Sequence, residues 1–331
     1  MAVSSAPSSL TSKLLTLDLG GEVVGVHFLG QPAAFALGDG SIALWDGAGE
    51  QRIPAHTGTI LSVAGDARRL LTGGDDGRVI ATTGDGAHRT LVEQKGRWID
   101  AVAVGPDGAF AYSAGKTAHF HPAKGEAKRL DVPSTVGGLA FAPKGTRLAI
   151  AHYGGARLWF PNAVAKPEEL EWKGSHRGVA WHPEGRFLVT AMQEPALHGW
   201  RLPDAAHMRM SGYPTRVRSM SFTAGGRFLA TSGSNEVILW PFASKDGPMG
   251  KQPTMLAPRD VRVTAVAAHP KDEVVACGYE DGLVLLCRIS DAAEILLRAP
   301  QGSPVSALAW RPDGTALAIG TEDGKAGLLA L

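Results

Sequence analysis

Short apolar runs separated by glycine-rich turns repeat along almost the whole chain. One unit is an apolar run, a tight turn, a second apolar run ending in a small residue, another turn, and a third run that ends near Trp. The clearest copies are residues 138–151, 219–232 and 307–320. Runs this short, rich in Val, Leu, Ile and aromatic residues and bounded by glycine, are typical of β-strands. The pattern therefore predicts an all-β repeat fold.

One internal distance sets the register of the units. The residue that closes each first run is followed ten positions later by a small residue, in the eight pairs Phe28/Gly38, Ala64/Gly74, Val104/Ala114, Phe141/Ala151, Trp181/Ala191, Phe222/Ser232, Ala268/Gly278 and Trp310/Gly320. Successive units lie about 40 residues apart, which is the period of a four-stranded propeller blade. We therefore predict a closed β-propeller of eight four-stranded blades, with seven blades as the alternative. The small residue is expected to let neighbouring sheets approach closely.

The two ends of the chain predict how the ring closes. The third strand of the eighth unit, near residues 325–331, uses up the sequence and leaves nothing for a fourth strand. Residues 13–19 contain an alternating apolar pattern that stops at Gly20-Gly21, so they are predicted to form a short strand. We expect this strand to complete the last blade, because closure removes exposed sheet edges. The predicted organisation is a flexible tail over residues 1–12 and a single propeller domain over residues 13–331.

Composition narrows the class of protein. The chain has 331 residues, is 44% hydrophobic and has a formal net charge of +1. The apolar content excludes a wholly disordered chain, and the near-zero charge argues against a nucleic-acid partner. The apolar runs are too short to span a bilayer, and the first ten residues lack the basic and apolar regions of a secretory signal. With only two cysteines, a cytoplasmic protein without a membrane partner is expected.

The units resemble the WD-repeat (tryptophan–aspartate repeat) family of β-propellers over about residues 13–331. The resemblance rests on Asp-Gly hairpins, on Pro-Asp-Gly turns, and on residues at the ends of third strands, which are Leu44-Trp45-Asp46, Leu158-Trp159, Gly199-Trp200 and Leu239-Trp240. The family's His–Asp–Ser/Thr–Trp set is incomplete. The second unit has His56, Thr72 and Asp76 without Trp, and the fifth has His176 and Trp200 without the Asp-Gly hairpin.

The resemblance implies a rigid, non-catalytic scaffold without a cofactor. Protein partners would bind on the face that carries the loops into each first strand and the hairpins between second and third strands. Two alternatives from other classes remain: a propeller enzyme of the lactonase or redox kind, and a metal-binding accessory protein. The chain shows no Gly-x-Ser-x-Gly nucleophile elbow and no phosphate-binding loop followed by a helix. Fold alone does not exclude an enzyme.

Histidine and cysteine are the candidates for metal or redox chemistry. His119 and His121 are two positions apart on a predicted third strand, so their side chains share one face, and His152 is the candidate third ligand. The simpler interpretation is that these histidines are structural. Cys277 and Cys287 flank one hairpin and are expected on neighbouring strands, as buried apolar filler.

Arginine gathers at one position of the repeat. Four or six residues before the end of the first run, where each unit should reach the mouth of the ring, consecutive units five to seven carry Arg177, Arg216, Arg218 and Arg262. Such a basic sector suits recognition of a partner's acidic segment, with Trp98 and Tyr279 as aromatic anchors. The competing interpretation is neutralisation within the chain by Glu194, Glu236, Glu280 and Asp281.

Overall fold

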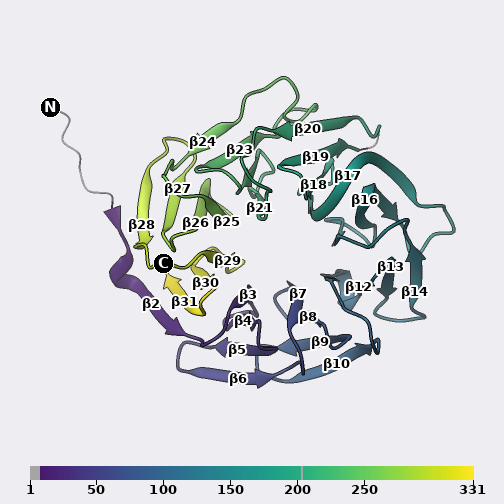
Figure 1. Cartoon of the computed structure of the whole chain (residues 1–331), viewed down its shortest axis with the longest axis horizontal. Coiled ribbons are helices and arrows are strands. Elements are labelled where there is room, and N and C mark those ends of the chain that lie inside the picture. Colours follow the sequence, from purple (N-terminus) through teal and green to yellow (C-terminus); the bar gives the residue numbers. More distant parts are fainter. Residues whose placement is uncertain (1–7, 203) are drawn as a thin grey trace.

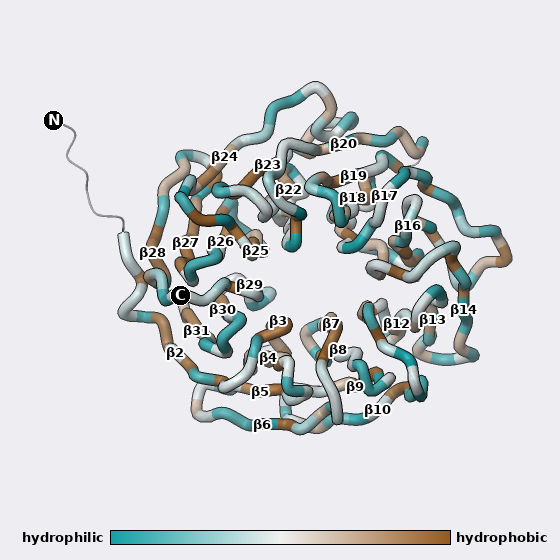
Figure 2. Tube along the Cα trace, in the orientation of Figure 1, coloured by the Kyte–Doolittle hydropathy of each residue, from teal (hydrophilic) through white to brown (hydrophobic). Residues whose placement is uncertain are grey.

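The computed structural model describes residues 8–202 and 204–331, which form a ring of radial β-sheets around a common centre (Figure 1). The first two sheets each have four antiparallel strands: β3 (Val23–Phe28), β4 (Ala33–Leu37), β5 (Ser41–Trp45) and β6 (Glu50–Pro54); then β7 (Ile60–Gly65), β8 (Arg69–Gly74), β9 (Arg78–Thr83) and β10 (His88–Glu93). The first strand of each sheet lies innermost. Outer strand β6 is largely hydrophilic and inner strand β3 largely hydrophobic (Figure 2).

The remaining sheets follow in chain order. The third has β11 (Ala101–Val104), β12 (Phe110–Ala114), β13 (Thr117–His121) and β14 (Lys128–Asp131). The fourth has β15 (Gly138–Phe141), β16 (Leu148–Trp159), β17 (Glu168–Trp181), β18 (Phe187–Met192), β19 (Ala196–Arg201) and β20 (His207–Ser211). Next come β21 (Met220–Phe222), β22 (Phe228–Thr231), β23 (Val237–Pro241) and β24 (Thr254–Leu256), and then β25 (Val263–Ala268), β26 (Val274–Tyr279), β27 (Val284–Arg288) and β28 (Glu294–Arg298). The last repeat unit supplies β29 (Val305–Trp310), β30 (Ala316–Thr321) and β31 (Lys325–Ala330).

Helical structure in the described residues is confined to two 3-10 turns, η1 (Thr11–Lys13) and η2 (Pro106–Gly108). Within the described part of the chain, no helix has the length and apolar character needed to cross a membrane.

Counted as hydrogen-bonded sheets, the propeller has seven blades rather than the predicted eight. The difference arises in the six-stranded sheet, where β17 runs without a loop from the end of the fourth unit into the start of the fifth. Its Gly174 has a φ of +136°, a conformation that a side chain disfavours, and this lets the strand change course within one sheet. The first segment of β17 pairs with β16 and the second pairs with β18.

All eight first-to-second-strand pairs predicted from the ten-residue spacing form antiparallel ladders. Each first strand also contacts the next around the ring, in the closed order β3, β7, β11, β15, β17, β21, β25, β29 and back to β3. The spacing therefore identified every repeat unit, while the division of those units into separate sheets differs at β17.

The amino-terminal strand completes the last sheet as predicted. β2 (Leu14–Asp18) pairs antiparallel with β31, with Leu14 opposite Leu329 and Asp18 opposite Lys325. The predicted flexible tail over residues 1–12 includes residues that pair with the ring. β1 (Ser8–Ser9) pairs parallel with β28, because this outer strand offers unpaired backbone groups, and the amide of Leu10 donates to the carbonyl of Leu296. Residues 1–7 lie outside the described residues.

The packing role expected of the small residue holds at some units and fails at another. A Cβ placed on Gly320 would lie 2.7 Å from Cβ of Val23, and one on Gly278 would lie 2.5 Å from Cβ of Val305, each on the first strand of the following unit. Gly38 is different, since its nearest neighbour would be Cβ of Glu22 at 3.6 Å, an ordinary contact. The close approach of sheets therefore depends on glycine at Gly278 and Gly320, and not at Gly38.

Candidate partner-binding site

A hollow of about 260 Å³ brings three of the four predicted arginines together. Arg216 and Arg218 precede β21, and they share one side of the chain because Val217 between them is buried in the core. Arg262 immediately precedes β25 and enters the same hollow. The hollow lies at the end of the sheets where loops enter the first strands and where second and third strands are joined, which is the face predicted to bind partners.

The three arginines differ in how far they are neutralised. Arg262 makes two hydrogen bonds to the carboxylate of Glu280, one of them from Nε at 3.0 Å. Arg218 lies 3.9 Å from Glu322, at the limit of an ion pair. Arg216 donates to the amide oxygen of Gln193 at 3.2 Å and has no carboxylate partner among residues 8–202 and 204–331. The predicted neutralisation is thus real at Arg262 and absent at Arg216.

The carboxylates expected to neutralise the sector are only partly used. Glu194, Glu236 and Asp281 form no ion pair with these arginines in the described structure, whereas Glu280 does. The hydrogen bonds from Arg262 lower the pKa of Glu280, and the same bonds raise the pKa of Arg262. Three guanidinium groups and two carboxylates line the hollow, so it keeps an excess positive charge.

Arg177 and Trp98 stay outside this hollow. Arg177 is exposed on the second segment of β17, one unit before Arg216, and it has no ion-pair partner in the described part of the chain. Trp98 lies in the loop between β10 and β11 and is 65% exposed. Its unit lies across the ring from β25, so Trp98 does not join the arginines in one pocket (Figure 1).

Tyr279 is not an exposed anchor, which corrects the sequence prediction. Its side chain is 0% exposed, within the core cluster that contains Cys277 and Cys287, and its hydroxyl donates to the carbonyl of Ala257 at 2.6 Å. Burial raises the pKa of Tyr279. The physical reason is that β26 is buried on both faces: Cys277 and Tyr279 pack in one core cluster and Ala276 in another, so a tyrosine on this strand is not at the surface.

Sequence reasoning missed Glu322, which faces Arg218. A signal for it existed, because Glu322-Asp-Gly occupies the same place in its unit as Glu280-Asp-Gly does one unit earlier. Gln193 carried no comparable signal, since its contact with Arg216 depends on the conformation of two side chains from different units.

Comparison with known proteins places this geometry in a family. Residues 207–241 match the family model described as WD domain, G-beta repeat, and residues 266–331 match the model described as anaphase-promoting complex subunit 4 WD40 domain. Together with the ring of four-stranded repeat units, these matches decide the family. The chain is a WD40-repeat β-propeller.

Two curated proteins are similar in sequence to parts of this propeller. Telomerase protein component 1 of Mus musculus is 25% identical over 201 residues, and serine-threonine kinase receptor-associated protein of Dictyostelium discoideum is 29% identical over 108 residues. The matches cover 58% and 33% of this chain, but only 7% and 35% of those proteins.

A solved structure matches the WD40 propeller over nearly its whole length. The crystal structure of the computationally designed Ika8 protein aligns with a TM-score of 0.76 and 18% sequence identity, covering 95% of this chain and 98% of that one. This likeness concerns the fold alone.

The WD40 hydrogen-bond set is present in part, as the sequence predicted. In the second unit Nε2 of His56 lies 2.8 Å from the Thr72 hydroxyl, and Nδ1 of His56 lies 3.0 Å from Oδ1 of Asp76. In the fifth unit His176 bonds Thr190 at 2.7 Å and packs 5.6 Å from the ring of Trp200. These contacts fasten the inner strands and leave the histidines with structural roles.

The three weak metal candidates do not come together as a site. His119 and His121 share a face of β13, as predicted, but their rings stack on Tyr112 and Phe110 of the neighbouring strand at 4.5 and 4.6 Å. Burial lowers the pKa of both. His152 bonds the carbonyl of Tyr153 through Nδ1 at 2.8 Å. Over the described residues, no group of three or more His, Cys, Asp or Glu side chains is arranged to hold a metal ion.

Cys277 and Cys287 lie on neighbouring strands, as predicted. Both are free thiols with 0% exposure, and their sulfurs are 3.6 Å apart.

His198 gives the WD40 propeller a predictable response to acid. Its ring is 0% exposed, stacks 4.0 Å from Trp172, and has no hydrogen-bond partner at either nitrogen in the described structure. Burial, with the nearby His176, lowers the pKa of His198 to about 3. Between its ordinary value of 6.5 and about 3, the unfolded chain therefore binds a proton that the folded chain excludes, and stability falls as the pH falls.

We expect unfolding free energy to drop when the pH is lowered from about 7.5 to about 5.5, by about 1.4 kcal/mol per pH unit for His198 once below its unfolded pKa. The variant His198→Phe keeps the stacked ring without the titrating group, so it should be as stable as the wild type at the higher pH and lose less at the lower one. Urea unfolding at both pH values measures this. A wild-type pH dependence in the variant would contradict the assignment.

Proposed function

We propose that this WD40 propeller is a non-catalytic, cytoplasmic protein–protein interaction scaffold whose partner docks an acidic segment at the hollow of Arg216, Arg218 and Arg262. The single observation that carries the proposal is that, among the described residues, Arg216 has no carboxylate partner and the neighbouring Arg218 has one only at 3.9 Å. Membership of a family whose propellers generally act as protein-binding scaffolds supports the class of function.

The chemistry of the hollow suits a carboxylate ligand. Guanidinium groups bind carboxylates through paired hydrogen bonds, and several around one rim attract an acidic segment at long range. Arg177 lies one unit before Arg216 and extends the positive sector beyond the hollow. Trp98 is the remaining exposed aromatic candidate, and we propose that it contacts a partner long enough to reach across the ring.

We also propose that the six-stranded sheet consists of two blades, so that the ring has eight blades, one for each repeat unit. Support comes from the closed cycle of eight first strands and from β16, whose residues 148–151 pair with β15 while Tyr153 and residues 155–158 pair with β17. Ala149 and Leu158 from the two halves of β16 share one hydrophobic cluster. An experimental structure tests this. If β16 and β17 are each divided into two strands, eight blades are supported; if the strands pair without a break through Gly154 and Gly174, the proposal is contradicted.

Charge reversal separates binding from folding. Arg216→Glu with Arg218→Glu should abolish binding of a fluorescent hexaglutamate peptide, because it replaces the two least neutralised cations by anions. Wild-type binding should weaken as salt increases. The melting temperature should change little, since exposed ion pairs contribute only about 0–1 kcal/mol.

The matched control is Arg68→Glu with Arg89→Glu, which makes the same change in net charge at two exposed arginines outside the hollow. It should bind the peptide as the wild type does to within a factor of about two, apart from general charge repulsion. Equal loss in both double variants, or retained binding with a lowered melting temperature in the first, would refute the proposed site.

A further inference from the structure

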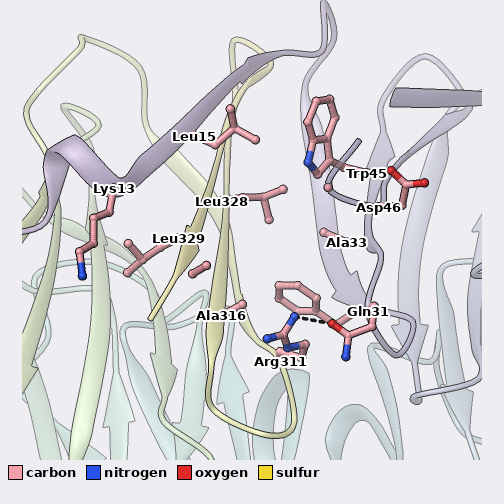
Figure 3. Close-up of a pocket in the computed structure, with 13 residues that line it drawn as sticks. Lys13, Leu15, Gln31, Ala33, Trp45, Asp46, Arg311, Ala316, Leu328 and Leu329 are labelled. Carbon is pink, nitrogen blue, oxygen red and sulfur yellow. Dashed lines mark hydrogen bonds between the residues drawn. The ribbon is translucent and has the colours of Figure 1, made fainter. Parts of the chain in front are cut away.

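A second hollow, of about 270 Å³, lies where the last repeat unit meets the first (Figure 3). One wall comes from β2, β30 and β31 and includes Leu15 and Leu328; the other comes from the first unit and includes Trp45. Arg311 and Gln31, which close one end of the hollow through a 2.9 Å hydrogen bond, belong to turns between first and second strands. The hollow therefore lies toward the opposite end of the sheets from the arginine hollow.

Small side chains create the space. Ala33 on the first-unit wall and Ala316 and Ala330 on the other wall line the hollow, where larger residues would fill the seam. Leu15 lies directly opposite Leu328 in the β2–β31 ladder and is nevertheless 43% exposed, so apolar surface is left uncovered. Pockets for small molecules generally measure about 300–1,000 Å³. This hollow is below that range and suits one large side chain.

The charged residues of the hollow indicate which group should lie next to that side chain in a ligand. Lys13 lines the hollow and has no carboxylate partner in the described part of the chain. Arg311 is paired with Asp313 at 3.0 Å, whereas Asp46 on the first-unit wall is an anion that accepts the backbone N–H groups of Ala48 at 2.9 Å and Gly49 at 3.1 Å. These backbone hydrogen bonds lower the pKa of Asp46. Lys13 is therefore the charged side chain of this hollow that has no polar partner among the described residues, and the carboxylate of an incoming chain would pair with it.

Trp45 adds a polar group on the facing wall. Its indole N–H has no hydrogen-bond acceptor among the described residues, and Figure 3 shows its ring on the first-unit wall of the hollow. An indole N–H beside an apolar surface suits the backbone carbonyl of an incoming chain.

We propose that this hollow binds an extended segment of a protein partner that inserts one large apolar side chain between the last and first units and places a neighbouring carboxylate at Lys13. The segment's backbone carbonyl accepts the N–H of Trp45. The site is independent of the arginine hollow, so the scaffold holds partners at two positions on opposite ends of its sheets.

Selection from a phage-displayed random heptapeptide library on the full chain tests this proposal. Peptides are then measured against Ala330→Phe, which fills the hollow with the chain's own side chain, and against Lys13→Glu. The control is Lys144→Glu, at an exposed lysine in the turn between β15 and β16. Melting temperatures verify that each variant folds, and Leu15→Ala replaces Ala330→Phe should that variant fail to fold.

The expected peptides carry a large apolar residue beside Asp or Glu, and they lose at least about tenfold in affinity with Ala330→Phe and with Lys13→Glu, but not with Lys144→Glu. Failure to select any peptide, or selected peptides whose binding survives both variants of the hollow, would overturn the proposal. Self-association of the wild type that Ala330→Phe abolishes would overturn it as well, because a second copy would then be the occupant.

Discussion

Removing residues 1–19 is expected to lower the melting temperature more than any point substitution in the ring. The truncated chain loses β2 and exposes the edge of β31. It also exposes apolar side chains that Leu17 and Leu19 cover in the hydrophobic cluster between the last and first units. Burial of Leu19, which is 3% exposed, is alone worth about 1.5–3 kcal/mol. The link from Leu10 to β28, which fastens the last two units together, disappears too.

Calorimetry of the full and truncated chains measures the loss, which should come with reduced cooperativity. A chain lacking only residues 1–7 keeps all of these contacts and is the reference against which the loss of residues 8–19 is measured. A synthetic peptide of residues 8–20 added to the truncated chain should restore part of the lost stability by mass action. A truncated chain that melts like the full one would show that β2 does not close the ring.

Gly320→Ala is expected to destabilise the propeller where the last repeat unit meets the first. The new Cβ would lie 2.7 Å from Cβ of Val23, although carbon atoms in contact prefer about 3.5–4.0 Å. Gly320 lies on the second strand β30 and Val23 on the first strand β3, and these strands pack across the closing seam, so the seam must open. Overpacking of this kind costs about 1–3 kcal/mol.

Gly38→Ala is the matched control, because it occupies the same place in the first unit and its added Cβ would meet only ordinary contacts. Chemical denaturation should show a marked loss for Gly320→Ala and little change for Gly38→Ala. Equal effects of the two substitutions would mean that the loss reflects glycine itself and not the approach of neighbouring sheets.

The repeat units were predictable because strand pairing imposes a fixed spacing. In each unit the first and second strands pair antiparallel across a short turn. The end of the first strand therefore precedes the small residue of the second strand by a fixed distance, as Trp310 precedes Gly320 by ten residues. The strand at residues 13–19 was predictable from the missing last strand. The joining of two units into one sheet was not predictable from the sequence. It depends on the backbone conformation of Gly174, which glycine can adopt but does not have to adopt.

The site was predictable to the level of position and charge. Counting from the end of the first strand placed Arg216, Arg218 and Arg262 at one mouth, and two neighbouring units bring them into one hollow. Whether a guanidinium meets a carboxylate depends on side-chain conformation, so the pairing of Arg262 with Glu280 needed the structure. The burial of Tyr279 was available from alternation along β26, because it lies two residues after Cys277.

Quantitative affinity purification from the native host tests the central claim most directly. The baits are the wild type, the double variant Arg216→Glu with Arg218→Glu, and the control Arg68→Glu with Arg89→Glu. The scaffold account predicts specific protein partners that the wild type and the control both retain and that the first double variant loses while its melting temperature stays unchanged. Recovery of the same partners with all three baits would contradict it.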